Sequence, residues 1–231
     1  VLTNDMDTTA IDQQRAQLAL KVNFLPALAN VLKTKNRPLT DYQWVSVEAL
    51  QVQWLMGWFK LWFCHRDTIL VKGEHEPEYF AATDNEPAKI VFAHGFFASA
   101  LHEISHWCMA GQKRRLLNDF GYWYAPDGRN EEQQQQFEQV EILPQAIECL
   151  LTLACNKPFS VSKDNLFADF DTSQSTFEAD VHAQAVKFWQ TGQKLSTDAK
   201  VLLSQLTKLR PLPLTSFDIS HNFIKVNFYQ S

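Results

Sequence analysis

The sequence is poor in several features that would assign a protein to a specialised class, beginning with paired cysteines. Its four cysteines include no Cys-X-X-Cys pair, and each lies in an apolar run. Isolated cysteines in apolar surroundings are typical of buried, reduced thiols. A disulfide framework is therefore not expected.

An excess of basic residues is also lacking. The 231 residues include 21 Lys and Arg against 26 Asp and Glu, so the formal net charge is −5. A chain of this charge has no overall positive field to attract nucleic acid or anionic lipid. Direct nucleic-acid binding is therefore not expected.

Neither a targeting segment nor an uninterrupted apolar segment is visible. Residues 1–14 lack the basic stretch and the apolar stretch of a secretory signal. Residues 45–63 are long and aromatic, but four residues interrupt them: Glu48, Gln51, Gln53 and Lys60. These are too many for a membrane span, so we expect a buried helix, with a partner-binding face as the alternative. A cytoplasmic protein without membrane attachment is expected.

The chain does contain enough apolar material for a substantial core, with 45% hydrophobic residues, 17 Phe and 7 Trp. Short β-branched runs at residues 68–73 and 88–96 predict two strands, and the aromatic run at 119–130 predicts a third that closes in a Pro-Asp-Gly turn. Helical periodicity predicts helices at 8–34 with a break at Pro26, 98–115 with a break at Gly111, 131–159 with an interruption at Pro144, 173–193, and 196–209.

These elements predict a helix-rich α+β fold with a small sheet. No internal repeat is visible in the sequence, so one central domain with appendages is expected. We place an N-terminal helical extension at residues 1–42, a catalytic domain at 43–210, and a C-terminal tail, packed on that domain, at 211–231.

The stretch FASALHEISHWCMAG, residues 97–111, contains a His-Glu-X-X-His motif on a predicted helix. His102 and His106 are one turn apart on the same face, so their imidazoles can bind a single metal ion. Glu103 is rotated about 100° from His102, which places it beside the ion. The motif follows a predicted strand and begins a helix, which favours a metal site over a chance pair of histidines. The packing face of this helix is predicted to hold Leu101, Ile104 and Cys108.

A third ligand is expected from the helix that contains FEQVEILPQAIE, residues 137–148. Four polar side chains recur there at spacings of three and four residues and share one helical face: Glu138, Glu141, Gln145 and Glu148. Glu141 is the preferred ligand, because Gln145 is four residues further on and can hydrogen-bond its carboxylate. Glu138 is the alternative.

Four segments resemble the elongation factor P hydroxylase family: KIVFAHGFFASALHEISHWCMAG, DFGYWYAPDGR, FEQVEILPQA and VHAQ, in this order. The similarity extends from about Thr68 to about Trp189. It implies an enzyme that hydroxylates the β-lysylated lysine of translation elongation factor P. It also implies an iron site of two histidines and one carboxylate, which corresponds here to His102, His106 and a glutamate of FEQVE. The His-Glu-X-X-His arrangement itself resembles gluzincin-type metallopeptidases, so a zincin-like domain is expected.

The ligand set of two histidines and one carboxylate is compatible with both hydroxylation and peptide hydrolysis. Zinc would activate water at one open position, with Glu103 as general base, whereas Fe(II) would keep positions open for oxygen and substrate. From the resemblance we expect Fe(II), with zinc or another divalent metal as the alternative in a purified sample, and molecular oxygen and modified elongation factor P as partners. In a hydroxylase, Glu103 would orient a bound water or the substrate amine. A zinc metallopeptidase and a binding module with a structural metal are the alternative functions.

A cationic lysine substrate requires carboxylates and aromatic faces around it. Tyr122, Tyr124 and Asp127 are predicted to supply them, with Asp119 and Trp123 beside them in the sequence. The basic residues 113–115 either contact an acidic surface of the partner or place favourable charge near a helix C-terminus.

Overall fold

The computed structural model describes residues 41–121, 128–155, 157–163 and 175–209. Contacts divide the chain into two compact units, residues 1–100 and residues 101–231. The helices predicted at residues 8–34 and the predicted tail at 211–231 lie outside the described residues, and the domain boundaries remain predictions. Among the described residues, no helix is both long and apolar enough to cross a membrane.

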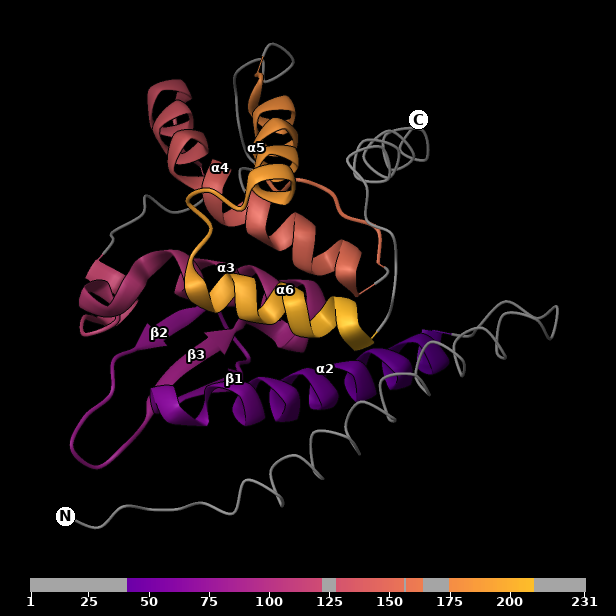
Figure 1. The fold of residues 1–231 in the computed structure, drawn as a ribbon, viewed down its shortest axis with the longest axis vertical. Coiled ribbons are helices and arrows are strands. Elements are labelled where there is room, and N and C mark those ends of the chain that lie inside the picture. Colours follow the sequence, from indigo (N-terminus) through magenta and orange to yellow (C-terminus); the bar gives the residue numbers. More distant parts are fainter. Residues whose placement is uncertain (1–40, 122–127, 156, 164–174, 210–231) are drawn as a thin grey trace, which may run out of the picture. The chain divides into compact units, whose positions relative to one another are not determined.

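The first unit contains a three-stranded sheet of order β1-β3-β2 (Figure 1). β1 (Thr68–Lys72) is parallel to β3 (Ala88–Phe92), and β2 (Glu78–Phe80) is antiparallel to β3. Side chains alternate between the two faces of a strand, and the cross-strand neighbours Leu70, Ile90 and Tyr79 are all buried. They form an apolar row on one face. The strand predicted at 68–73 is confirmed up to Lys72, and the strand predicted at 88–96 is confirmed up to Phe92, after which the chain forms a 3₁₀ turn.

Two features of the strands differ from the sequence predictions. β2 was not predicted, because a run of three residues is too short to show alternation. The strand predicted at 119–130 is wrong at both of its described ends: Asn118–Gly121 forms the 3₁₀ turn η3, and residues 128–130 are irregular, with Asn130 capping α4. Asp119, Phe120 and Gly121 have φ values of 47°, 56° and 68°, and this left-handed backbone is incompatible with a strand. Residues 122–127 lie outside the described residues.

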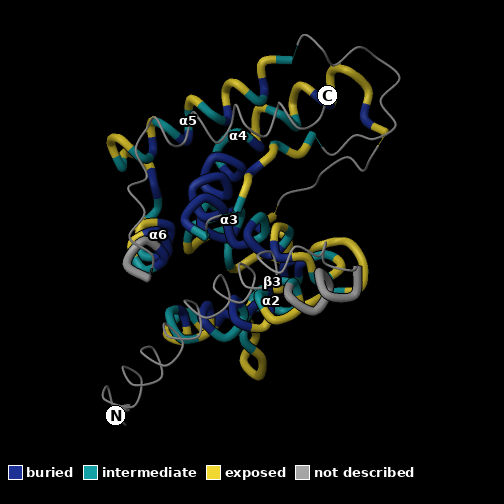
Figure 2. Tube along the Cα trace, turned by 90° about the vertical axis from the view of Figure 1, so that its right-hand side faces the viewer, coloured by how far each residue is buried: buried dark blue, intermediate teal, exposed yellow. Residues whose placement is uncertain are grey.

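α2 (Asp41–Phe63) packs against β1, and buried and exposed positions both occur along its described residues (Figure 2). Leu55, Phe59 and Phe63 are almost fully buried, whereas Gln53 and Lys60 are exposed. The buried helix predicted for residues 45–63 is therefore confirmed. Of the polar residues that argued against a membrane span, Gln53 and Lys60 are exposed, whereas Glu48 and Gln51 are half-buried.

α3 (Phe97–Arg114) begins directly after β3 and the 3₁₀ turn η2 (Ala93–Gly95). Glu48 of α2 accepts a hydrogen bond from the backbone N–H of Phe97 at 2.7 Å, and the hydroxyl of Ser99 accepts one from the N–H of Ala93 at 3.0 Å. The first N–H groups of a helix lack partners within the helix, and a carboxylate there also interacts favourably with the helix dipole. These contacts fix the start of the helix that contains the His-Glu-X-X-His motif.

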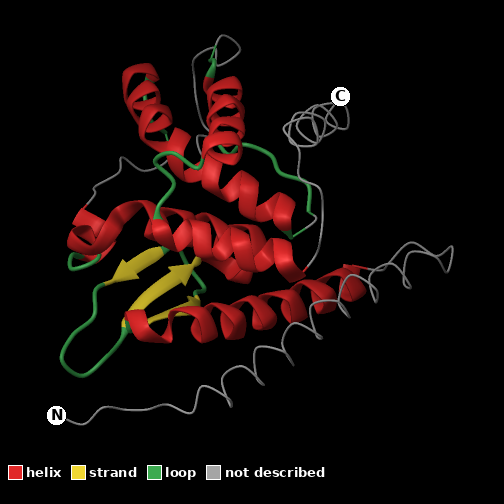
Figure 3. Ribbon diagram, in the orientation of Figure 1, coloured by secondary structure: helices red, strands yellow, loops and turns green. Residues whose placement is uncertain are grey.

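The second unit is helical beyond α3, with α4 (Glu131–Ala154), α5 (Phe177–Thr191) and α6 (Thr197–Leu209) (Figure 3). α4 packs against both α5 and α6. Its N-terminus has a reciprocal cap, in which the Asn130 side chain accepts from the N–H of Gln133 and the Gln133 side chain accepts from the N–H of Asn130. The described residues are thus helix-rich with a small sheet, and the predicted α+β class is confirmed.

The interruption predicted at Pro144 is wrong, because α4 continues through this residue as one helix. A proline inside a helix removes one backbone hydrogen bond and displaces a carbonyl of the preceding turn, which bends the helix without necessarily ending it. α4 is bent along its course (Figure 1). Burial of Pro144 and of the turns after it, including Ile147 and Leu150, stabilises the helical path.

The basic residues at the end of α3 are used mainly within the second unit. Arg115 donates to the carbonyl of Trp107 from Nε at 2.9 Å and Nη2 at 2.7 Å, and from Nη1 to Asp198 at 2.7 Å. Arg114 donates to the carbonyl of Phe120 at 2.9 Å, whereas Lys113 is exposed. The arginines therefore stabilise the end of α3, which favours the helix-terminus alternative for them.

Replacing Arg115 tests this role. Arg115→Ala is expected to lower the free energy of unfolding by about 3–5 kcal/mol, because it removes the guanidinium that is paired with the buried carboxylate of Asp198. Arg115→Lys retains the charge but lacks the planar fork that binds both acceptors, so an intermediate loss is expected. Denaturant titration measures both changes. Lys113→Ala is the matched control and should change the stability by less than about 0.5 kcal/mol; an equally small effect of Arg115→Ala would contradict the role.

Candidate metal centre

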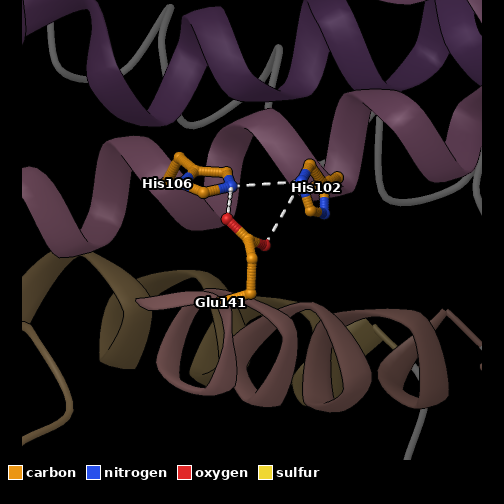
Figure 4. A group of neighbouring side chains, drawn as sticks. All are labelled: His102, His106 and Glu141. Atoms are coloured by element: carbon orange, nitrogen blue, oxygen red, sulfur yellow. Dashed lines mark hydrogen bonds and ion pairs between the residues drawn. The ribbon is translucent and has the colours of Figure 1, made fainter. Parts of the chain in front are cut away.

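His102 and His106 of α3 meet Glu141 of α4 (Figure 4). The two histidine Nε2 atoms are 3.0 Å apart. Glu141 Oε1 lies 3.3 Å from Nε2 of His106, and Oε2 lies 3.8 Å from Nε2 of His102. One donor atom from each residue lies within 4.8 Å of the other two. Since metal–nitrogen bonds are about 2.0–2.1 Å long, donors at these separations can face one ion, and the residues fit a metal.

Local sequence explains why the three side chains converge. The spacing of four residues puts both imidazoles on one face of α3, and the predicted packing face, Leu101, Ile104 and Cys108, is buried. Side-chain exposure is 2% for Glu141, 13% for His106 and 26% for His102. The carboxylate is therefore the deepest of the three donors, and His102 is the one most accessible to solvent.

The carboxylate of Glu141 is held in place by Gln145. The Gln145 amide donates to Glu141 Oε2 at 3.3 Å and to the carbonyl of Ser162 at 2.8 Å. Its oxygen accepts from the backbone N–H of Ser162 at 3.0 Å. Because the Ser162 backbone contacts both ends of the amide, the amide has one favoured orientation, with its N–H groups toward Glu141. The predicted contact between Gln145 and Glu141 is present.

Glu138, the alternative ligand, contacts other groups. Its Oε2 accepts from the hydroxyl of Ser175 at 2.7 Å, and its Oε1 accepts from the amide of Gln134 at 3.2 Å. Within the described residues, the group of side chains that could hold a metal contains Glu141 and not Glu138. The geometry therefore favours Glu141 as the third donor.

Glu148 contacts the other side of His102, with its Oε2 2.8 Å from Nδ1. The sequence placed Glu148 on the same helical face as Glu141 but gave it no role. The sequence feature that could have pointed to Glu148 is its spacing of seven residues from Glu141, since two helical turns return a side chain to nearly the same face.

The charges of these groups are strongly coupled. Burial by itself would lower the pKa of His102, but the carboxylates of Glu148, Glu103 and Glu141 raise it to about 10. Burial would raise the pKa of Glu141, but His106, His102 and the hydrogen bond from Gln145 lower it to about 2. Three carboxylates thus surround two imidazoles, an environment that favours positive charge at the imidazoles, including that of a metal cation.

Glu103, the predicted catalytic residue, is partly buried beside the two histidines. Burial raises the pKa of its carboxyl, while His102 and His106 act in the opposite direction. A carboxyl with a raised pKa at such a position can take part in proton transfer. Its catalytic role remains a prediction.

The predicted substrate-binding residues Tyr122, Tyr124 and Asp127 lie outside the described residues, as does Trp123. Asp119 is described and is exposed on η3. The aromatic pocket for a lysine side chain therefore remains a prediction.

The fold and the site together define a helix-rich α+β protein with a candidate centre of two histidines and one carboxylate for a metal ion. A family model described as elongation factor P hydroxylase matches residues 58–214. The elongation factor P lysine hydroxylase of Haemophilus influenzae is 43% identical over 157 residues, which cover 67% of this chain and 88% of that protein. The chain belongs to the elongation factor P hydroxylase family, as its sequence motifs indicated.

Metal binding should raise the thermal stability of the metal-free protein. A ligand that binds only the native state stabilises it by about 2.7 kcal/mol at one hundred times its dissociation constant, so a higher melting temperature is expected on titration with Fe(II) or Co(II). His106→Ala and Glu141→Ala should abolish the shift. Glu138→Ala, a matched change on the same helix, should retain it. Loss of the shift in Glu138→Ala but not in Glu141→Ala would make Glu138 the ligand.

Proposed function

We propose that this protein is an iron-dependent, oxygen-using hydroxylase of the β-lysylated lysine of translation elongation factor P. The carrying observation is family membership: the relative from Haemophilus influenzae is named as an elongation factor P lysine hydroxylase. The matched range, residues 58–214, includes all three proposed metal ligands. A cytoplasmic location, without direct binding to nucleic acid or membrane, is part of the proposal.

The proposed ligands of the iron are His102, His106 and Glu141. Two imidazoles and one carboxylate are the ligand set of non-haem Fe(II) oxygenases, which leave other positions open. When bound, the iron would supply the activation of oxygen that hydroxylation requires. The proximity of the three donors supports this assignment.

The remaining residues of the site would bind and orient the substrate. Glu141 is the most buried donor and His102 the most exposed, so we propose that the substrate lysine approaches from the His102 side. Glu103 is proposed to orient the substrate amine by a hydrogen bond, and its raised pKa would let it exchange a proton with that amine. Tyr122, Tyr124 and Asp127 are proposed to contact the cationic side chain through aromatic faces and a carboxylate.

Intact-mass measurement tests the reaction directly. The metal-free protein is loaded with Fe(II) under anaerobic conditions and then given oxygen, a reductant and β-lysylated elongation factor P. The substrate is expected to gain one oxygen atom, and peptide mapping should place it on the modified lysine. His106→Ala and Glu141→Ala should give no gain, whereas Glu138→Ala should remain active. The proposal fails if the iron-loaded wild type adds no oxygen.

Glu103→Gln distinguishes the hydroxylase from a peptidase with the same motif. We expect the variant to bind Fe(II) as the wild type does and to lose about 100-fold in hydroxylation kcat, the lower end of what a positioned proton-transfer group contributes. The zinc-loaded wild type should not cleave an unstructured protein such as casein. Cleavage by the zinc form that Glu103→Gln abolishes would instead indicate a peptidase general base.

A further inference from the structure

The two ring nitrogens of His102 face different carboxylates of α4. Nδ1 lies 2.8 Å from Oε2 of Glu148, while Nε2 lies 3.0 Å from Nε2 of His106 and 3.8 Å from Oε2 of Glu141. An ionised carboxylate can only accept hydrogen bonds, so Nδ1 must carry the hydrogen. In the neutral ring, Nε2 then has the free lone pair, and it points toward the other two proposed ligands.

The surroundings of Glu148 argue against an incidental surface contact. Glu148 is 8% exposed, and its neighbours on α4, Ile147, Cys149 and Leu150, are fully buried. A buried carboxylate is costly unless it is hydrogen-bonded or paired with charge. The position of Glu148 at Nδ1 provides such a contact.

The same geometry argues against Glu148 as a metal ligand. Its contact is at Nδ1, whereas the proposed donors converge at Nε2. Within the described residues, the group that could hold a metal contains His102, His106 and Glu141, without Glu148. Glu148 therefore contacts a ligand and does not join the donor set.

α4 provides both contacts because of its helical spacing. Glu141 and Glu148 are seven residues apart, which is about 10 Å along the helix axis. Glu141 lies nearest to His106 and Glu148 lies nearest to His102. One helix thus supplies a proposed ligand and a hydrogen-bond acceptor for a second ligand.

We propose that Glu148 is a positioning residue of the metal centre: by accepting the hydrogen of His102 Nδ1, it fixes the tautomer and the orientation of the ring so that Nε2 can bind the metal. This inference rests on the proposed metal site. A histidine ligand whose second nitrogen donates to a carboxylate is also a stronger donor, and loss of such a carboxylate lowers metal affinity by about 10- to 100-fold.

The test measures metal binding in the absence of elongation factor P. Full-length, metal-free wild type and the variants Glu148→Ala and Glu148→Gln are titrated anaerobically with Co(II), by calorimetry and by visible absorption. Glu148→Ala is expected to raise the Co(II) Kd by about 10- to 100-fold and to change the absorption of bound Co(II). In Glu148→Gln the amide oxygen can still accept from Nδ1, so a smaller increase in Kd and a spectrum close to that of the wild type are expected.

Glu132→Gln is the matched control, because Glu132 is an exposed glutamate in the first turn of the same helix. It should bind Co(II) as the wild type does. Circular dichroism establishes which variants are folded. If Glu148→Ala is unfolded, Glu148→Gln tests the proposal alone: a raised Co(II) Kd with little change in the absorption spectrum supports it.

Two outcomes would overturn the proposal. In the first, every folded Glu148 variant has the Co(II) Kd and absorption spectrum of the wild type. Even if these variants melt at a lower temperature, this result would mean that Glu148 only stabilises the fold. A complete loss of Co(II) binding in Glu148→Gln, equal to that in Glu141→Ala, would mean that Glu148 is itself a ligand. Failure of the wild type to hydroxylate elongation factor P would overturn the proposed function but leave this result intact, because no substrate is present in the titration.

Discussion

The carboxylate of Glu141, buried against the Nε2 atoms of His102 and His106, is the interaction on which the candidate site depends. A carboxylate that is 2% exposed costs free energy unless positive charge and hydrogen-bond donors compensate it. Here the two imidazoles and the amide of Gln145 provide that compensation. The contact also links α3 to α4, so the helix packing in this unit and the chemistry of the site are not separable.

α3, which carries both histidines, has a carboxylate at its N-terminus and a guanidinium near its C-terminus. The carboxylate of Glu48 accepts from the N–H of Phe97 at the N-terminus, and the guanidinium of Arg115 donates to the carbonyl of Trp107 toward the C-terminus. Both signs are favourable for the helix dipole. A ligand pair one turn apart keeps its geometry only if that turn is regular, and these contacts, with the buried face of α3, restrain it.

The parts of the structure that depend on local spacing could be predicted from the sequence. The pairing of His102 with His106 and the contact of Gln145 with Glu141 both follow from the helical repeat. The contact of Glu148 with His102 joins residues 46 positions apart; helical spacing places Glu148 on the face of Glu141 but does not identify His102 as its partner. Two other features differ from the local sequence pattern. α4 continues through Pro144 because burial of the helix outweighs the cost of a proline. The aromatic residues at 119–130 favour a strand, whereas Asp119–Gly121 form a left-handed turn.

The proposed substrate and the exposure of the site are mutually consistent. The donors become less accessible from His102 to His106 to Glu141, which supports the proposed approach of the substrate from the His102 side. A lysine that carries β-lysine extends beyond the lysine itself, so the site has to accept the added group as well as the reacting lysine. Its distal end is cationic, and the buried carboxylates around the histidines attract positive charge. Two histidines and a glutamate serve both zinc and iron chemistry, so the ligands alone do not determine the reaction.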